Sequence, residues 1–312
     1  MTSAPSHPLG RFYAALGHAT HSALGVLWID VGRFSLTSVP YADTVEATQE
    51  DVDALLWQSG KLAAVFPTPL ATGVESTAFW VRGREYGRQS LQRQFFQHVR
   101  RGAKECEVRS IDWATLRMKG RACTIDTLAR RGILSSPTIQ ATGWERMCEA
   151  GAAVAGLEAW GCFHGDDLLA YLISWSQGET CEALIMHRAE AAGPLRATNL
   201  LLYEFTRLIC QRPELESVSM GRDWLPTHLS IARFKSHAGY QAEPIRVAVV
   251  LHPAVRRVLG HASTRAALAL LRQLTGHRSA AIDNLEILEA AAVTQVPSRS
   301  ADLLHGPHAR RR

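Results

Sequence analysis

The chain has 312 residues, of which 46% are hydrophobic and 20% are charged, so it can bury two modest cores or one large composite core. This balance excludes a disordered or fibrous protein, and the net charge of +5 allows anionic partners without requiring nucleic acid. The six cysteines are scattered without a CxxC pair, which argues against a metal or disulfide framework and favours thiols in a reducing cytoplasm.

The chain carries no sign of a membrane or secretion segment. No apolar run approaches the ~20 residues that a membrane-spanning helix needs. The N-terminal residues lack a basic region followed by an apolar stretch, as a secretion signal would require. We therefore expect a soluble, cytoplasmic protein of bacterial type.

The first 150 residues mix strand and helix patterns. Residues 26–41 have the β-branched and aromatic content of a hairpin. A helix is predicted to begin after Thr48, with Asp51 as its capping partner, and to end at Gly60. The spacing of Leu91, Phe95 and Val99 places them on one face of a helix. The elements predicted after residue 60 are strands at 61–66, 77–83 and 106–112 and a helix at 87–105.

Basic side chains are concentrated between residues 82 and 131. Two interpretations remain open: a solvated helical face, or a groove for a phosphate-bearing ligand, which is either a coenzyme or RNA. The basic residues are Arg82, Arg84, Arg88, Arg93, Arg100, Arg101, Lys104, Arg109, Arg117, Lys119, Arg121, Arg130 and Arg131.

The second half of the chain has a clearer order of elements. Three apolar runs joined by tight turns predict an antiparallel meander. A helix with an apolar stripe follows and ends before Pro213. The full order is β-β-β-α-β-α-β, with the elements at 156–164, 168–176, 181–188, 200–212, 215–223, 226–239 and 244–251.

The chain changes character after His252. Residues 253–295 are rich in alanine and leucine and are expected to form a helical extension. The polar residues 296–312 offer almost nothing to bury, and we expect this tail to be disordered.

This order of elements and its ending resemble the GNAT acyltransferase fold. The stretch "FKSHAGY" at 234–240 places Gly239 where a helix would end in a left-handed conformation and Tyr240 where the chain re-enters a core. The pair Phe234–Lys235 before that glycine is similar to the FemAB group. The resemblance covers roughly residues 150–252. It implies an α/β (α+β) fold, a mixed sheet flanked by helices, with two GNAT-like halves in tandem at 10–150 and 151–252.

The resemblance also implies where a donor would bind. In GNAT domains two parallel strands splay apart, the activated acyl group enters between them, and the next helix N-terminus receives the donor phosphates. Here the strands would be 181–188 and 215–223. The loop departs from the family pattern (Q/R)xxGx(G/A), as it does in FemAB proteins, which use aminoacyl-tRNA. Its donor-binding candidates are Arg188, Gly193, Arg196 and Asn199, with Pro194 able to start the helix.

The same comparison suggests catalytic residues. Lys235 stands where many GNAT enzymes have a tyrosine, and it would stabilise developing charge; the alternative is a solvated helix residue. Glu182 and His187 are candidate general bases, His187 because its unperturbed pKa is near ~6.5. Both Arg222 and Asp223 would bind substrate, or else form an ion pair that closes a turn.

The resemblance implies an N-acyltransferase that moves an acyl or aminoacyl group from a thioester or from aminoacyl-tRNA to an amine. Acyl-CoA or aminoacyl-tRNA would be a co-substrate, with no permanently bound cofactor and no metal. The acceptor would be a small molecule or a peptide, and tRNA is a possible partner. The alternative is a catalytically degenerate GNAT-like module that binds a ligand or a protein.

Overall fold

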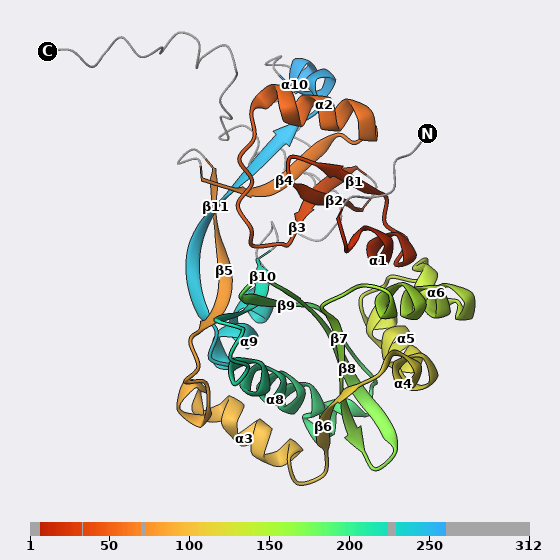
Figure 1. Ribbon diagram of the computed structural model, residues 1–312, viewed down its shortest axis with the longest axis vertical. Helices are drawn as coiled ribbons and strands as arrows, with labels where there is room; N and C mark the ends of the chain where they lie inside the picture. The colour runs from red at the N-terminus through yellow and green to blue at the C-terminus, as the bar shows by residue number, and fades with distance from the viewer. Residues whose placement is uncertain (1–6, 33, 70–72, 224–228, 260–312) are drawn as a thin grey trace, which may run out of the picture. The chain divides into compact units, whose positions relative to one another are not determined.

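A computed structural model describes residues 7–32, 34–69, 73–223 and 229–259 (Figure 1). Two compact units divide this part of the chain. Unit 1 contains residues 7–19, 78–221 and 229–243, and unit 2 contains residues 20–77, 222–223 and 244–259. The expected boundary at residue 150 does not coincide with this division, because the strands at 74–82 and 241–251 each contribute residues to both units. Tandem GNAT-like halves stay a prediction.

The strands of unit 1 confirm the predicted meander. β7 pairs with β8 and β8 with β9, both antiparallel, and β6 adds to β7 in the same sense. The strand order is β5-β10-β9-β8-β7-β6. Their bounds are β5 (Val74–Arg82), β6 (Glu107–Ile111), β7 (Leu157–His164), β8 (Asp167–Gln177), β9 (Thr180–Arg188) and β10 (Ser217–Arg222).

Helices cover both faces of this sheet (Figure 1). Ala170 and Leu172 of β8 lie in the core that α3 and α8 close, whereas Tyr171 between them packs against α5 and α6. This separation follows from the period of two along a strand. The helices of unit 1 are α1 (Gly10–Ala15), α3 (Arg93–Gly102), α4 (Trp113–Lys119), α5 (Arg121–Arg130), α6 (Ala141–Ala152), α7 (Ala192–Leu195), α8 (Ala197–Cys210) and α9 (Leu229–His237), with 3-10 turns η1 (Arg88–Ser90) and η2 (Pro137–Ile139).

The end of α9 has the predicted geometry. Gly239 has a φ of +88°, and a Cβ at this position would lie 2.6 Å from the carbonyl oxygen of Ser90. The next residue, Tyr240, is buried, and its hydroxyl lies 2.7 Å from Oγ1 of Thr206 on α8. A glycine is therefore required both by the backbone conformation and by the close approach of η1.

Unit 2 contains the predicted hairpin and the capped helix. Its strand order is β1-β2-β3-β4-β11, in which β3 and β4 are parallel and the other pairs are antiparallel. Thr48 and Asp51 form a capping box at the start of α2, and Gly60 ends the helix with a φ of +66°. The elements are β1 (Thr20–Ala23), β2 (Val26–Val31), β3 (Ser35–Val39), α2 (Gln49–Ser59), β4 (Ala63–Thr68), β11 (Gln241–Leu251) and α10 (Pro253–Leu259).

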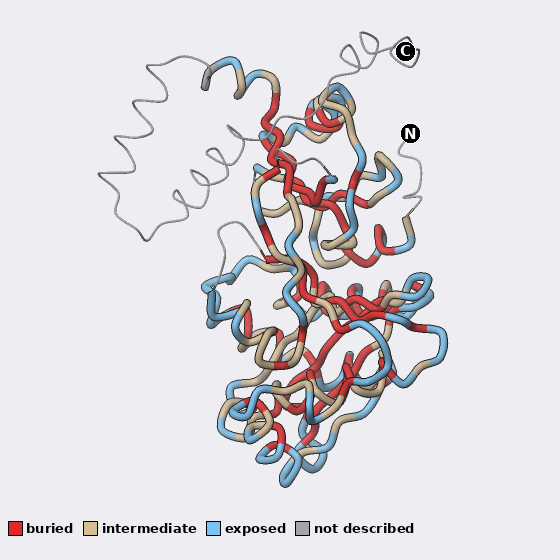
Figure 2. Tube along the Cα trace, turned by 90° about the vertical axis from the view of Figure 1, so that its left-hand side faces the viewer, coloured by how far each residue is buried: buried red, intermediate tan, exposed pale blue. Residues whose placement is uncertain are grey.

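The core of unit 2 forms where α2 packs on the strands. Trp28 and Phe66 meet edge to face, with their ring centroids 5.3 Å apart. Leu55 and Leu56 of α2 pack in the same cluster. Figure 2 shows buried stretches alternating with exposed ones along the chain. Apolar residues of strands and helices in both units are among the buried ones, so apolar burial is the main stabilising contribution.

Several sequence expectations need correction. Leu91 lies beyond η1 and outside α3, so it does not share a helix with Phe95 and Val99. The helices α1, α4, α5 and α6 were not predicted, because their short apolar stripes are interrupted by basic and small residues. Of the predicted helical extension at 253–295 only α10 is described. The rest of it and the tail at 296–312 lie outside the described residues.

Candidate functional site

The strands β9 and β10 separate as predicted. Their parallel register runs from Thr180–Ser217 to Glu182–Ser219 and ends there, although β9 continues to Arg188. A bulge on β9 follows directly, since Ala183 and Ile185 pair with consecutive residues of β8. Residues 183–188 of β9 therefore have an edge that β10 does not cover.

Among the described residues of this unit, one carboxylate and one ammonium group are buried. Glu182, the last β9 residue that pairs with β10, is 3% exposed. Lys235 of α9 is 6% exposed, and its Nζ lies 4.6 Å from the ring centroid of Phe79. The alternative of a solvated Lys235 is wrong, because an aromatic face and the core enclose its ammonium group. A buried charge of this kind is costly unless it is stabilised locally.

His187 does not have the near-neutral pKa that favoured it as a general base. Its Nδ1 lies 2.8 Å from the hydroxyl of Tyr171 and 3.2 Å from Oγ1 of Thr124. Burial, together with the charges of Arg131 and Arg130, lowers the pKa of His187 to about 3. The imidazole is therefore neutral at physiological pH and is a weak base.

The loop from β9 to α8 brings the predicted donor-binding residues together. A Cβ on Gly193 would lie 3.2 Å from Nη1 of Arg188, so the glycine leaves room for this guanidinium. Arg196 has a left-handed φ of +58°, and α8 begins after it without a side-chain cap. The N–H of Asn199 donates to the carbonyl of Arg196 at 3.1 Å. Pro194 lies in the short helix α7 and does not start α8, which begins at Ala197.

Two polar atoms at this helix start lack hydrogen-bond partners among the described residues. They are Nε of Arg196 and Oγ1 of Thr198, both buried. Buried polar atoms are normally hydrogen-bonded, and the first N–H groups of a helix have no partner within it. The start of α8 therefore has unused hydrogen-bonding capacity, and the helix dipole favours an anion there.

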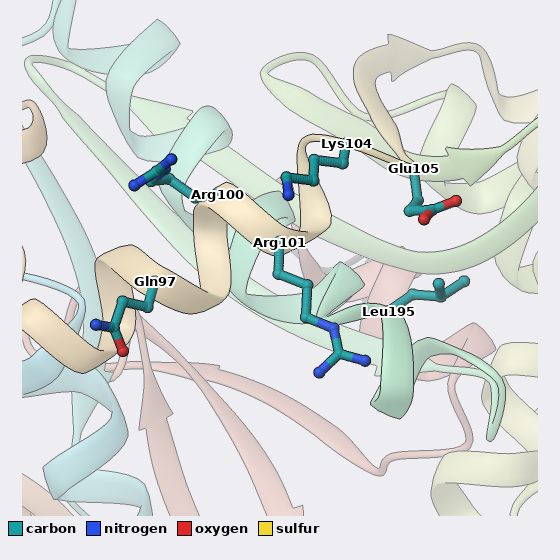
Figure 3. A pocket seen from close by; sticks show the side chains of 6 residues that line it. All are labelled: Gln97, Arg100, Arg101, Lys104, Glu105 and Leu195. Carbon is teal, nitrogen blue, oxygen red and sulfur yellow. The ribbon is translucent and has the colours of Figure 1, made fainter.

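Helix α3 adds cations beside this helix start. The α-carbon of Gly102 packs so closely that a Cβ would lie 3.1 Å from Cβ of Leu200 and 3.3 Å from the carbonyl of Arg196. A hollow of about 480 Å³ lies between α3 and Leu195, and Arg101 extends towards the segment that carries Leu195 (Figure 3). The hollow is lined by Gln97, Arg100, Arg101, Lys104, Glu105 and Leu195.

The cations around this hollow influence a neighbouring histidine. Partial burial and the charges of Arg196 and Arg101 lower the pKa of His98. Both arginines are therefore close enough to create a positive potential at one place. This arrangement supports the phosphate-binding interpretation of the basic segment for α3, although other basic residues of the segment are solvated.

The predicted substrate residues Arg222 and Asp223 lie in unit 2 and serve its framework. One guanidinium nitrogen of Arg222 donates to Oγ1 of Thr37 at 3.0 Å, and the N–H of Asp223 donates to the carbonyl of Thr77 at 2.8 Å. Burial lowers the pKa of Arg222 to about 10. These contacts hold the end of β10 in place.

Sequence reasoning missed α5, which binds backbone groups of residues 188–190, at the start of the loop from β9 to α8. Thr127 Oγ1 contacts both backbone groups of Arg188, and Asp126 accepts from the N–H of Glu190 at 2.8 Å. The available pattern was Thr124 and Thr127, two polar residues three apart beside the apolar Cys123 and Leu128. Polar side chains on such a face need partners, and that requirement could have indicated a functional contact.

The described part of the chain has neither a metal-binding cluster nor a helix that could cross a membrane. No group of histidine, cysteine and carboxylate side chains there is arranged to hold a metal ion. None of the described helices combines the length and the apolar composition needed to cross a membrane. All six cysteines are free thiols, and five of them are buried.

Comparison with known proteins gives the fold. No family model and no curated protein matches the chain. The C-terminal domain (DUF2156) of an Agrobacterium fabrum protein described as a lysylphosphatidylglycerol synthetase is 13% identical, with 83% of this chain and 92% of that one covered and a TM-score of 0.51. FemX is 10% identical, with 81% and 93% covered and a TM-score of 0.51. The fold is GNAT-like and of the FemAB type. This confirms the predicted fold and its α/β sheet flanked by helices.

Proposed function

We propose that this protein is a transferase that moves an acyl or aminoacyl group from an activated donor to an amine acceptor. The observation that carries the proposal is the β9 edge at 183–187 that β10 does not cover, followed by a loop that ends at the uncapped start of α8. An extended donor can pair with such an edge while its phosphates bind the helix N-terminus.

The donor's phosphates would be held by residues of three segments, most of them arginines. Arg188 and Gly193 belong to the loop, Arg196 precedes α8, and Arg101 lies on α3. The N–H of Asn199 is already used within the helix start, so its side-chain amide is the group offered to the donor. Charge-assisted hydrogen bonds from arginine suit phosphate oxygens.

The chemical step would use groups close to the point of separation. The acceptor amine attacks the donor carbonyl, a C–N bond forms, and the C–S or C–O bond to the leaving group breaks. Glu182 takes the proton that the amine loses, and Lys235 stabilises the negative charge that develops on the leaving group. His187 is a positioning residue in this mechanism, because its lowered pKa makes it a poor proton acceptor.

Both donor classes remain in the proposal. Acyl-CoA and aminoacyl-tRNA are co-substrates with phosphates next to a reactive carbonyl, and neither is a permanently bound cofactor. The printed name of one similar structure, lysylphosphatidylglycerol synthetase, refers to a lysyl-bearing product, which supports the aminoacyl version. The acceptor would be a small-molecule or peptide amine. A cytoplasmic location fits the six free thiols and a tRNA donor.

The protein could instead be a catalytically degenerate GNAT-like module that binds a ligand. The neutral, hydrogen-bonded His187 favours this alternative, since it removes one candidate base from the site. We propose correspondingly that Arg222 and Asp223 maintain the shape of unit 2 and influence substrate binding only indirectly.

A ligand panel followed by a transfer assay tests the proposal. Thermal unfolding is measured with acyl-CoA, coenzyme A, aminoacyl-tRNA and uncharged tRNA, because a ligand that binds the folded state raises the Tm. The donor that stabilises the protein is then incubated with a mixture of amines, and its discharge is measured. Stabilisation with donor discharge supports the transferase. Stabilisation without discharge supports the binding module, and no stabilisation by any ligand contradicts both.

A further inference from the structure

Helix α5 makes an unusual contact with the last residue of β9. The Thr127 hydroxyl accepts a hydrogen bond from the N–H of Arg188 at 2.8 Å and donates one to its carbonyl at 3.0 Å. A guanidinium nitrogen of Arg130 donates to the same carbonyl at 2.9 Å and to Oγ1 of Thr127 at 3.0 Å. Thr127 is buried, whereas Arg130 is exposed and its bond to this carbonyl lies at the surface.

The Arg188 backbone groups bound by Thr127 belong to the uncovered edge of β9. The N–H of Ala189 donates to the carbonyl of Leu169 next to β8, at 2.8 Å. Neighbouring residues of a strand direct their backbone groups to opposite edges, so the N–H and C=O of Arg188 face away from β8. That is the edge from which β10 has separated after Glu182. One hydroxyl therefore supplies at Arg188 both bonds that a neighbouring strand would supply.

We propose that Thr127 limits how much of the β9 edge a bound donor can pair with, and that it thereby selects the donor. Its side chain occupies the outermost pairing position of the uncovered edge, so a bound donor can pair with β9 only between residues 183 and 187. The donor chain then passes Thr127 without pairing at Arg188, and its phosphates reach the start of α8. This inference rests on the proposed function, because it concerns the donor that the same site binds.

The consequence concerns the class of donor. A short reactive group such as an aminoacyl ester needs few pairing positions, whereas a pantetheine arm has amide groups that gain affinity from a longer edge. The protein should therefore gain little affinity from a pantetheine arm. Arg130 and the bond from Glu190 N–H to Asp126 keep the loop in place on the other side of this position.

Two probes and three variants test the proposal. The probes are coenzyme A and 3′-phospho-ADP, which has the same nucleotide but lacks the pantetheine arm, and their Kd values are measured by calorimetry. The variants are Thr127→Gly, which empties the position, Thr127→Val, which removes the hydroxyl and keeps the bulk, and Thr127→Ser, which keeps the hydroxyl. Hydrogen exchange of the Arg188 amide shows whether each variant retains the contact.

We expect the two probes to bind the wild-type protein with similar Kd values. In Thr127→Gly, the affinity for coenzyme A should rise roughly tenfold relative to the affinity for 3′-phospho-ADP, which is the scale of one or two hydrogen bonds. Thr127→Val should lose protection of the Arg188 amide without this gain, because its methyl groups still fill the position. Thr127→Ser should behave as the wild type in both measurements.

The outcomes separate this proposal from the proposed function. A Kd ratio in Thr127→Gly within twofold of the wild-type ratio overturns the role of Thr127 in donor selection. If neither probe binds any variant, the role of Thr127 in donor selection is also overturned. The proposed transferase activity is then tested separately, by the discharge of aminoacyl-tRNA. Binding of coenzyme A to Thr127→Gly alone supports the role of Thr127 and excludes coenzyme A thioesters as the natural donor.

Discussion

At the scale of single residues, the structure changes the interpretation of Lys235 most. Its place in "FKSHAGY" suggested either a solvated or a functional lysine, and the structure buries it against the face of Phe79. Burial of an ammonium group costs free energy and makes it sensitive to nearby charge. A buried ammonium group at this position is suited to stabilising negative charge that develops beside it.

Replacement of this lysine by methionine tests that role. We expect Lys235→Met to lower the rate of transfer by about 100-fold or more, the usual effect of losing one group that stabilises developing charge. A single cooperative thermal transition of the variant shows that it still folds. Arg233→Met on the exposed side of the same helix is the matched control and should transfer normally. Normal transfer by Lys235→Met contradicts a catalytic role.

Sequence alone predicted some of these residues and not others. Gly239 and Tyr240 were predictable because a helix end and a return to the core follow from local rules. The burial of Lys235 and the lowered pKa of His187 were not, since they depend on Phe79, Tyr171 and other residues distant along the chain.

At the scale of elements, the strands were predictable and the helical layer on one face was not. The meander has long apolar runs and tight turns, so local pattern determined β7, β8 and β9. The separation of β9 from β10 came from the family resemblance and is confirmed by their short register. Helix α5 escaped prediction because its short apolar stripe is interrupted, and its contacts with the backbone of residues 188–190 join segments distant along the chain.

The basic side of α3 gives a prediction about anion binding. In the double variant Arg101→Ala and Lys104→Ala, we expect the affinity for the donor nucleotide to fall by about tenfold, since each exposed ion pair contributes up to ~1 kcal/mol. The dependence of affinity on salt should weaken as well. The matched control is Arg93→Ala on the same helix outside the hollow, and its affinity should be unchanged. An equal loss in both proteins would show that only overall charge matters, which contradicts a site on α3.

At the scale of the whole molecule, the family resemblance implied the fold class, whereas the division into units was not predicted. The order of elements and the residues 234–240 suggested a GNAT-like mixed sheet, and the comparison with FemX agrees. The division seen in the structure differs from the expected boundary at residue 150 and could not be predicted, because β5 and β11 each have residues in both units. Long-range pairing of this kind, such as β11 with β4, depends on contacts far apart in sequence.

Stability against acid is a property of the whole molecule. One largely buried histidine, His187, should contribute to the way the free energy of unfolding depends on pH. The pKa of His187 is about 3 in the folded protein and near its ordinary value of 6.5 in the unfolded chain. Below pH 6.5 the unfolded chain takes up a proton that the folded protein does not. The free energy of unfolding should therefore be highest above pH 6.5 and fall by roughly 1.4 kcal/mol per pH unit as the pH drops towards 3.

His187→Asn removes this proton uptake and provides the test. Urea unfolding of the wild type and the variant is measured from pH 7.5 to 4, where each curve also contains the titration of other groups. The difference between the two curves isolates His187, and we expect the wild type to lose up to about 3 kcal/mol more than the variant over this range. His164→Asn, at an exposed position, should follow the wild type. Parallel curves for wild type and His187→Asn would mean that His187 can be protonated in the folded state, which would restore it as a candidate general base.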